Sequence, residues 1–122
     1  MKSLYRTPES KEYFFIEGCF ILELYNSSED PGLSIARARV RPGIETRLHQ
    51  LHGVIERYII QSGQGSVTIA NNEPFNVIAN DVVVIPANQP QKIRNTGDTD
   101  LIFLAICTPR FTAEAYKDSG SE

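Results

Sequence analysis

The sequence has no tryptophan, two cysteines, two histidines and no long hydrophobic run. Cys19 and Cys107 each lie in an apolar segment and form no CxxC pair, so we expect two buried free thiols. No apolar run approaches the roughly 18 residues that a membrane-spanning helix needs. The first residues lack the unbroken apolar stretch of a signal peptide, which favours a cytoplasmic protein.

Positive charge is also scarce, since the net charge is −3. One local basic cluster exists, at Arg37, Arg39, Arg41 and Arg47, but apolar residues interrupt it and the chain carries 15 acidic residues. These features disfavour nucleic-acid binding. No serine or cysteine has a recognisable nucleophile setting, and no glycine-rich phosphate loop precedes a helix.

What the chain does have is the length and composition of one ordinary globular domain. Its 122 residues are 41% hydrophobic and 22% charged. We therefore expect a single domain over residues 1–122 with one core.

Apolar segments with period-two alternation recur along the chain and are separated by turn residues, which is typical of an all-β sandwich or barrel. A short helical turn is expected over Thr112–Lys117, and residues 118–122 are expected to be loose. The expected strands lie at 12–17, 19–25, 33–41, 47–51, 55–62, 65–70, 75–79, 82–86, 90–95 and 100–107.

Alternation also predicts which side chains share a face of a strand. Glu56, Tyr58 and Ile60 fall on one face, and that face points inward if His49 does. On the strand from Ser34, small residues alternate with arginines, so we expect the arginines to point outward. If they point inward instead, they become ligands for an anion.

The order and spacing of polar residues in the middle of the chain form a motif. It runs Gly43, five residues, His49, one residue, Leu51, four residues, Glu56, six residues, Gly63. This pattern resembles the first motif of the cupin superfamily, in which a glycine precedes HxH, a glutamate and a second glycine.

A second motif follows at Asn80–Asn95, with Pro86 and Gln91 at the spacing of the second cupin motif. Together the motifs span residues 43–95, and the strands at 12–25 and the tail at 108–122 complete the domain. The resemblance implies an all-β fold, an antiparallel jelly-roll barrel with a short C-terminal helical turn. Asn80 and Asn88 replace two motif glycines and can also adopt the left-handed conformation.

In metal-binding cupins, two histidines and the glutamate of the first motif converge with a histidine of the second on one divalent ion. The corresponding positions here are His49, Leu51, Glu56 and Gln91. His52 follows the lost ligand and precedes Gly53, so a bulge or turn could direct His52 toward the pocket mouth.

The resemblance therefore implies a metal set of His49, His52, Glu56 and Gln91, with Glu56 and His52 assisting proton transfer. Iron, manganese, nickel and zinc suit such a set. A divalent ion with one glutamate leaves a site of about +1, which attracts an anionic metabolite.

Two functional hypotheses follow. The first is a small metal-dependent enzyme acting on a polar or anionic metabolite, of isomerase, lyase, cyclase or dioxygenase type. The second is a barrel that binds a small ligand without turning it over, because Leu51 and Gln91 mark a degenerate metal site. We also expect a homodimer, since the strands over Glu12–Tyr25 carry many apolar residues.

Overall fold

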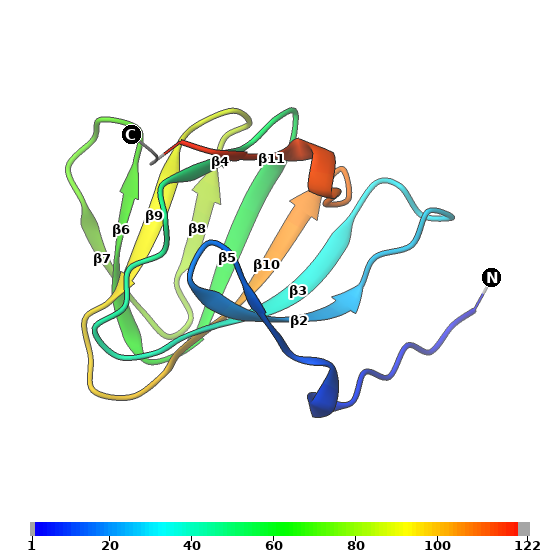
Figure 1. Ribbon diagram of the computed structural model, residues 1–122, viewed down its shortest axis with the longest axis horizontal. Helices are drawn as coiled ribbons and strands as arrows, with labels where there is room; N and C mark the ends of the chain where they lie inside the picture. The colour runs from blue at the N-terminus through cyan, green and yellow to red at the C-terminus, as the bar shows by residue number, and fades with distance from the viewer. Residues whose placement is uncertain (1, 120–122) are drawn as a thin grey trace.

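Two antiparallel sheets face each other in the structure, a computed structural model that describes residues 2–119 (Figure 1). The first sheet has the order β1 (Tyr13–Phe15), β2 (Cys19–Tyr25), β3 (Ser34–Val40), β10 (Leu101–Thr108), β5 (Ile55–Ser62) and β8 (Val82–Ile85). The second has the order β11 (Tyr116–Asp118), β4 (His49–Leu51), β9 (Gln91–Asn95), β6 (Gln64–Ile69) and β7 (Phe75–Ile78). This arrangement confirms the expected antiparallel jelly roll, and each expected strand has a counterpart.

Helical structure in the described residues is limited to two short 3₁₀ turns, η1 (Glu9–Lys11) and η2 (Ala113–Ala115). The expected C-terminal helical turn is therefore present, but it ends earlier than predicted. Residues Tyr116–Asp118 instead form β11, which pairs with β4 and places Asp118 opposite His49. The expectation of a loose tail was thus wrong for Asp118, because this residue pairs with His49 in the sheet. The last residues of the expected tail, 120–122, lie outside the described part of the chain.

The inner faces of the two sheets form the core, as the alternation predicted. Glu56, Tyr58 and Ile60 on β5 are all buried, and so are Phe103 on β10 and Ile93 on β9. A Glu on this face is exceptional, because burial of a carboxyl group is costly unless it is hydrogen-bonded. The polar end of the core therefore marks where a site can be built.

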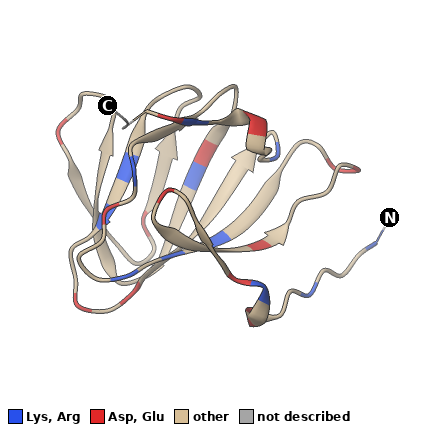
Figure 2. Cartoon of the chain, viewed as in Figure 1, with Lys and Arg blue, Asp and Glu red and all other residues tan. Residues whose placement is uncertain are grey.

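The arginines of β3 point away from the core, as expected. Arg37 pairs with Glu9 and Glu12, and Arg39 pairs with Glu12 and Asp100, so both guanidinium groups tie the N-terminal segment to the outside of the sheet. Elsewhere, Lys and Arg are interspersed with Asp and Glu along the chain (Figure 2). Arg37 and Arg39 are consequently not ligands of the barrel interior.

Two asparagines take the left-handed conformation where the second cupin motif has glycine, since φ is 77° at Asn80 and 68° at Asn88. Both free cysteines are buried, which agrees with the expectation of two thiols. Among residues 2–119 no helix is long and apolar enough to cross a membrane. The cytoplasmic location stays a prediction.

Candidate functional site

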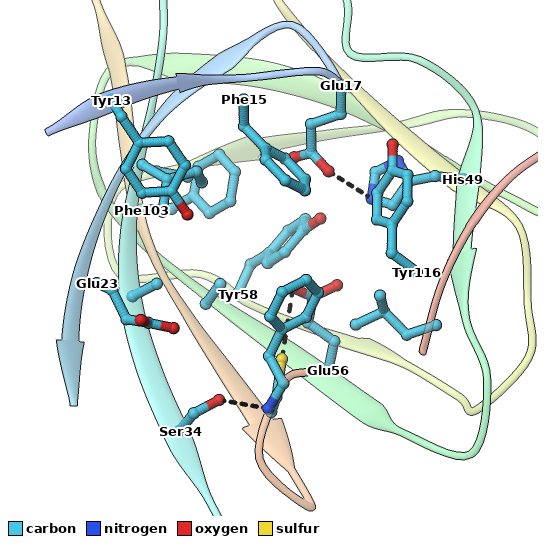
Figure 3. A pocket seen from close by; sticks show the side chains of 17 residues that line it. Tyr13, Phe15, Glu17, Glu23, Ser34, His49, Glu56, Tyr58, Phe103 and Tyr116 are labelled. Carbon is cyan, nitrogen blue, oxygen red and sulfur yellow. Dashed lines mark hydrogen bonds and ion pairs between the residues drawn. The ribbon is translucent and has the colours of Figure 1, made fainter. Parts of the chain in front are cut away.

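A pocket opens between the two sheets at one end of the barrel (Figure 3). Its floor is made of small side chains on β3 and β10, where Ala36 lies opposite Ala105 and Ser34 lies opposite Cys107. The space that the lining residues surround, including the open mouth, is about 600 Å³. The small residues are the reason for this space, since a leucine or phenylalanine at Ala36 or Ala105 would fill it.

Aromatic side chains form much of the remaining wall. Phe15 of β1 makes edge-to-face contacts with Phe111 and Tyr116, at ring-centroid distances of 6.4 and 5.2 Å. Tyr116 also stacks on the His49 imidazole at 5.3 Å. The rings therefore connect the N-terminal strand, the C-terminal segment and the first cupin motif around one cavity.

Glu56 extends from β5 into the polar end of the pocket and is 8% exposed. Its Oε1 accepts a hydrogen bond from Gln91 Nε2 at 3.0 Å, and Cys107 Sγ donates to its Oε2 at 3.8 Å. Burial and the nearby charge of Glu17 raise the pKa of Glu56 from 4.5 to about 8, although the two hydrogen bonds act in the opposite direction. The carboxyl group is therefore predominantly protonated at neutral pH.

His49 on β4 is 2% exposed, and its two ring nitrogens have different partners. Nδ1 lies 2.6 Å from the Arg47 carbonyl oxygen, which can only accept a hydrogen bond. Nε2 lies 2.9 Å from Gln91 Nε2 and 3.2 Å from Glu17 Oε1. The carbonyl partner assigns a hydrogen to Nδ1, and Nε2 is shared between the Gln91 amide and the Glu17 carboxyl group.

Gln91 on β9 is the link between the imidazole and the buried carboxyl group. Its Nε2 group donates to both His49 Nε2 and Glu56 Oε1, and its Oε1 accepts from the Tyr58 hydroxyl at 2.8 Å. All four side chains are buried. The amide thus satisfies three polar groups that would otherwise be left without partners in the core.

Glu17 is a site residue that the sequence analysis missed. It lies between β1 and β2, its side chain is 12% exposed, and it accepts a hydrogen bond from Cys19 Sγ at 3.0 Å. Glu23, at the exposed end of the pocket lining, was missed as well. Neither residue belongs to a cupin motif, and the alternation of Cys19, Ile21 and Glu23 along β2 was the available signal for an inward-facing Glu23.

The predicted metal set is only partly brought together. His49, Glu56 and Gln91 are in contact, whereas His52 is exposed and does not line the pocket. The turn holds His52 outward, because its backbone N–H donates to the Ala115 carbonyl oxygen at 2.8 Å and the Gly53 N–H donates to Asn88 Oδ1 at 2.9 Å. Gly53 does form the expected turn, with φ of 72°.

The buried side chains around Gln91 were expected to form a metal site. Within residues 2–119 no group of three or more His, Cys, Asp and Glu side chains is arranged to hold a metal ion. In addition, the Gln91 amide presents hydrogen-bond donors, not a ligand oxygen, to His49 and Glu56. The residues in this arrangement do not fit the expected metal.

Comparison with known proteins agrees with the fold. The cupin domain family matches residues 36–107, and the chain belongs to this family. It is 35% identical over 106 residues to an uncharacterized protein of Methanocaldococcus jannaschii, covering 85% of this chain and 84% of that protein.

Two further relatives are associated by name with oxalate. The oxalate-binding protein of Thermotoga maritima is 38% identical over 71 residues, which is 58% of this chain and 58% of that protein. The crystal structure of a predicted oxalate decarboxylase from the same organism superposes with a TM-score of 0.73 at 29% identity, covering 88% of this chain and 99% of that chain.

Proposed function

We propose that this cupin barrel binds a small organic molecule in the pocket by direct contact with its side chains, and that Glu56 donates a proton to it. The observation that carries the proposal is the buried Glu56 carboxyl group in the pocket wall, which is joined through the Gln91 amide to His49 Nε2 and whose pKa is raised to about 8 by burial and by Glu17. Efficient proton transfer needs an acid and a base with separated pKa values near the working pH. Isomerase- and lyase-type reactions need such a pair.

The relatives support the binding of a small molecule, since one of them is an oxalate-binding protein. The pocket supports it as well, because a concave, mostly apolar space with a few convergent polar groups is the usual form of a ligand site. His49 and Glu17 have the role of orienting the bound molecule and receiving a proton. A role for His52 in metal binding or proton transfer stays a prediction and requires the Gly53 turn to rearrange.

The proposal is tested by a fragment screen that uses ligand-observed NMR on protein treated with EDTA. Ala105→Leu fills the pocket floor, and Ala113→Leu adds the same volume at an exposed position on η2. Fragments that bind the pocket lose binding in Ala105→Leu and keep it in Ala113→Leu. Fragments that bind both variants equally would refute the pocket as the ligand site.

The alternative is a metal-dependent enzyme with iron, manganese, nickel or zinc. Its specific support is a series of short contacts. Glu17 Oε1 lies 3.2 Å from His49 Nε2, and Gln91 Nε2 lies 2.9 Å from His49 Nε2 and 3.0 Å from Glu56 Oε1. If the Gln91 amide is reversed, its oxygen faces His49 and Glu56 and becomes a possible metal ligand. Metal analysis of untagged protein decides between the two. About one equivalent of metal in wild type and its loss in His49→Ala would replace the present proposal.

We also propose that the chain forms a homodimer through β1. This strand is an edge of the six-stranded sheet, and Phe14 within it and Ile16 directly after it are 63% and 66% exposed. An apolar sheet edge is normally covered by another element. Light scattering should return about twice 13.7 kDa, and Phe14→Glu should shift the mass toward the monomer. A wild-type mass of one chain at micromolar concentration would refute the dimer.

A further inference from the structure

The Gln91 amide lies between the two side chains that a metal ion in this pocket would have to join. Its Nε2 atom is 2.9 Å from His49 Nε2 and 3.0 Å from Glu56 Oε1. All three side chains are buried, and Gln91 is 1% exposed. A zinc ion that joined an imidazole to a carboxylate would lie about 2.0–2.2 Å from each donor atom. The amide nitrogen is therefore next to both atoms that would have to bind such an ion.

The orientation of this amide follows from its other end. Gln91 Oε1 accepts a hydrogen bond from the Tyr58 hydroxyl group at 2.8 Å. Tyr58 is 2% exposed, and within residues 2–119 its hydroxyl group forms no other hydrogen bond. If the amide were reversed, the Tyr58 O–H group would face an NH₂ group and would lose its acceptor. A buried donor without an acceptor is costly, so Tyr58 favours the orientation that turns the amide nitrogen toward His49 and Glu56.

Tyr58 is itself held firmly in the pocket wall, where it is seen with His49 and Glu56 (Figure 3). It lies on β5, between its neighbours Ala105 on β10 and Val83 on β8. Its ring also contacts the Phe103 ring, with centroids 4.3 Å apart. A close-packed ring on a central strand has little freedom to move. The Tyr58 hydroxyl group is therefore a fixed donor for the Gln91 oxygen.

The amide nitrogen cannot act as a metal ligand, because an NH₂ group of glutamine only donates hydrogen bonds. It gives the Glu56 carboxyl group an uncharged donor where a cation would otherwise bind. Leu51, at the position of another expected ligand, is 6% exposed and has no donor atom in its side chain. Hydrogen bonding within the chain thus takes up the contacts that the expected metal would use.

We propose that the Gln91 amide, held by the Tyr58 hydroxyl group, takes the place of a bridging metal ion between His49 and Glu56, and that Tyr58 is a positioning residue of this metal-free site. The inference rests on the proposed function, because it explains how the pocket acts through its side chains alone. It also determines which oxygen of Glu56 donates the proton. Oε1 accepts from the amide, so the proton is carried by Oε2, whose neighbour at 3.8 Å is the weakly hydrogen-bonding Cys107 thiol.

Nuclear Overhauser contacts of the Gln91 side-chain amide test its orientation. In wild type, the amide protons should show cross-peaks to the His49 ring protons that flank Nε2. Tyr58→Phe removes the donor to Oε1, so the amide should populate the reversed orientation and its cross-peaks to the ring at position 58 should grow. Tyr25→Phe is the control, because it removes a hydroxyl group that is bonded to Asp30 outside the pocket, and it should leave the Gln91 signals unchanged.

Zinc binding to EDTA-treated, untagged protein, measured by calorimetric titration, tests the role of the amide N–H groups. Gln91→Glu keeps the size of the side chain but replaces the NH₂ group by a ligand oxygen, so it should raise the affinity for Zn²⁺ at least about tenfold. Gln61→Glu, the same change at an exposed position on β5, should leave the affinity unchanged. Exposed His52 is present in every variant, so any zinc that it binds cancels in the comparison.

Several results would overturn the inference. Wild-type cross-peaks from the Gln91 amide to the Tyr58 ring in place of His49 would show the reversed amide, and unchanged cross-peaks in Tyr58→Phe would remove the positioning role. One equivalent of zinc in wild type that His49→Ala abolishes would show a metal site.

An unchanged zinc affinity in folded Gln91→Glu would show that the amide N–H groups do not keep the ion out. Circular dichroism checks the folding of the variants, and the wild-type spectrum decides the question if a variant does not fold. Fragment binding that Ala105→Leu abolishes does not depend on the orientation of the amide, so the proposed function stands when only the orientation fails.

Discussion

Replacement of Glu56 by glutamine should change how the stability of the protein depends on pH. Glutamine keeps the size of the side chain and an oxygen that can accept from Gln91 Nε2, but it cannot ionise. The folded wild-type protein holds the Glu56 proton up to a pKa of about 8, whereas the unfolded chain releases it near 4.5. The substitution therefore isolates the cost of the buried ionisable group.

The sign follows from which state binds more protons. Between pH 4.5 and about 8 the folded protein keeps a proton that the unfolded chain has lost, so the free energy of unfolding falls as the pH rises. Below this window both states are protonated, and above it both are charged. A rise from 4.5 to about 8 corresponds to about 5 kcal/mol, at about 1.4 kcal/mol for each pKa unit.

Urea unfolding of wild type and Glu56→Gln across this pH window measures the effect. The variant should gain stability relative to wild type as the pH rises, by up to about 5 kcal/mol at the alkaline end. Glu73→Gln, at an exposed position between β6 and β7, is the control and should follow the wild-type curve. Parallel curves for wild type and Glu56→Gln would refute the argument, because they would mean that Glu56 is already charged in the folded protein.

Three further substitutions test the fold and the turn beside the site. Gly63→Ala should destabilise the protein by about 3 kcal/mol in urea unfolding, because φ is +85° and an added Cβ would lie 2.6 Å from the Asp100 carbonyl oxygen. The control is Gly32→Ala, which has open space around the added Cβ and should cost little stability. Unfolding midpoints that match for the two variants would contradict this. Asn95→Ala should lower the free energy of unfolding by about 2–3 kcal/mol, because the buried amide donates to two backbone carbonyl groups and accepts from a backbone N–H. A decrease of less than about 0.5 kcal/mol would contradict this role. His52→Ala should leave both stability and fragment binding unchanged, since the side chain is exposed outside the pocket, and a loss of binding would restore its predicted role.

The sequence by itself determined much of the framework of the barrel. Alternation along one strand put Glu56, Tyr58 and Ile60 on the buried face, and alternation along another put Arg37 and Arg39 outside. The resemblance to the two cupin motifs grouped His49, Glu56 and Gln91, and in the structure the Gln91 amide contacts the other two side chains. These inferences succeed because the direction of a side chain on a strand is a local property that repeats every two residues.

Only the tertiary structure decided what surrounds those residues. Glu17 meets His49 because the N-terminal hairpin folds over the end of the barrel, and no spacing in the sequence records that contact. His52 faces outward because its turn is hydrogen-bonded to a distant segment, the backbone of Ala115. The charge of the pocket follows from such contacts, since the pKa of Glu56 depends on burial and on a carboxylate from another strand pair. Burial and charge pairing are properties of residues that the chain brings together from far apart, so a local pattern cannot specify them.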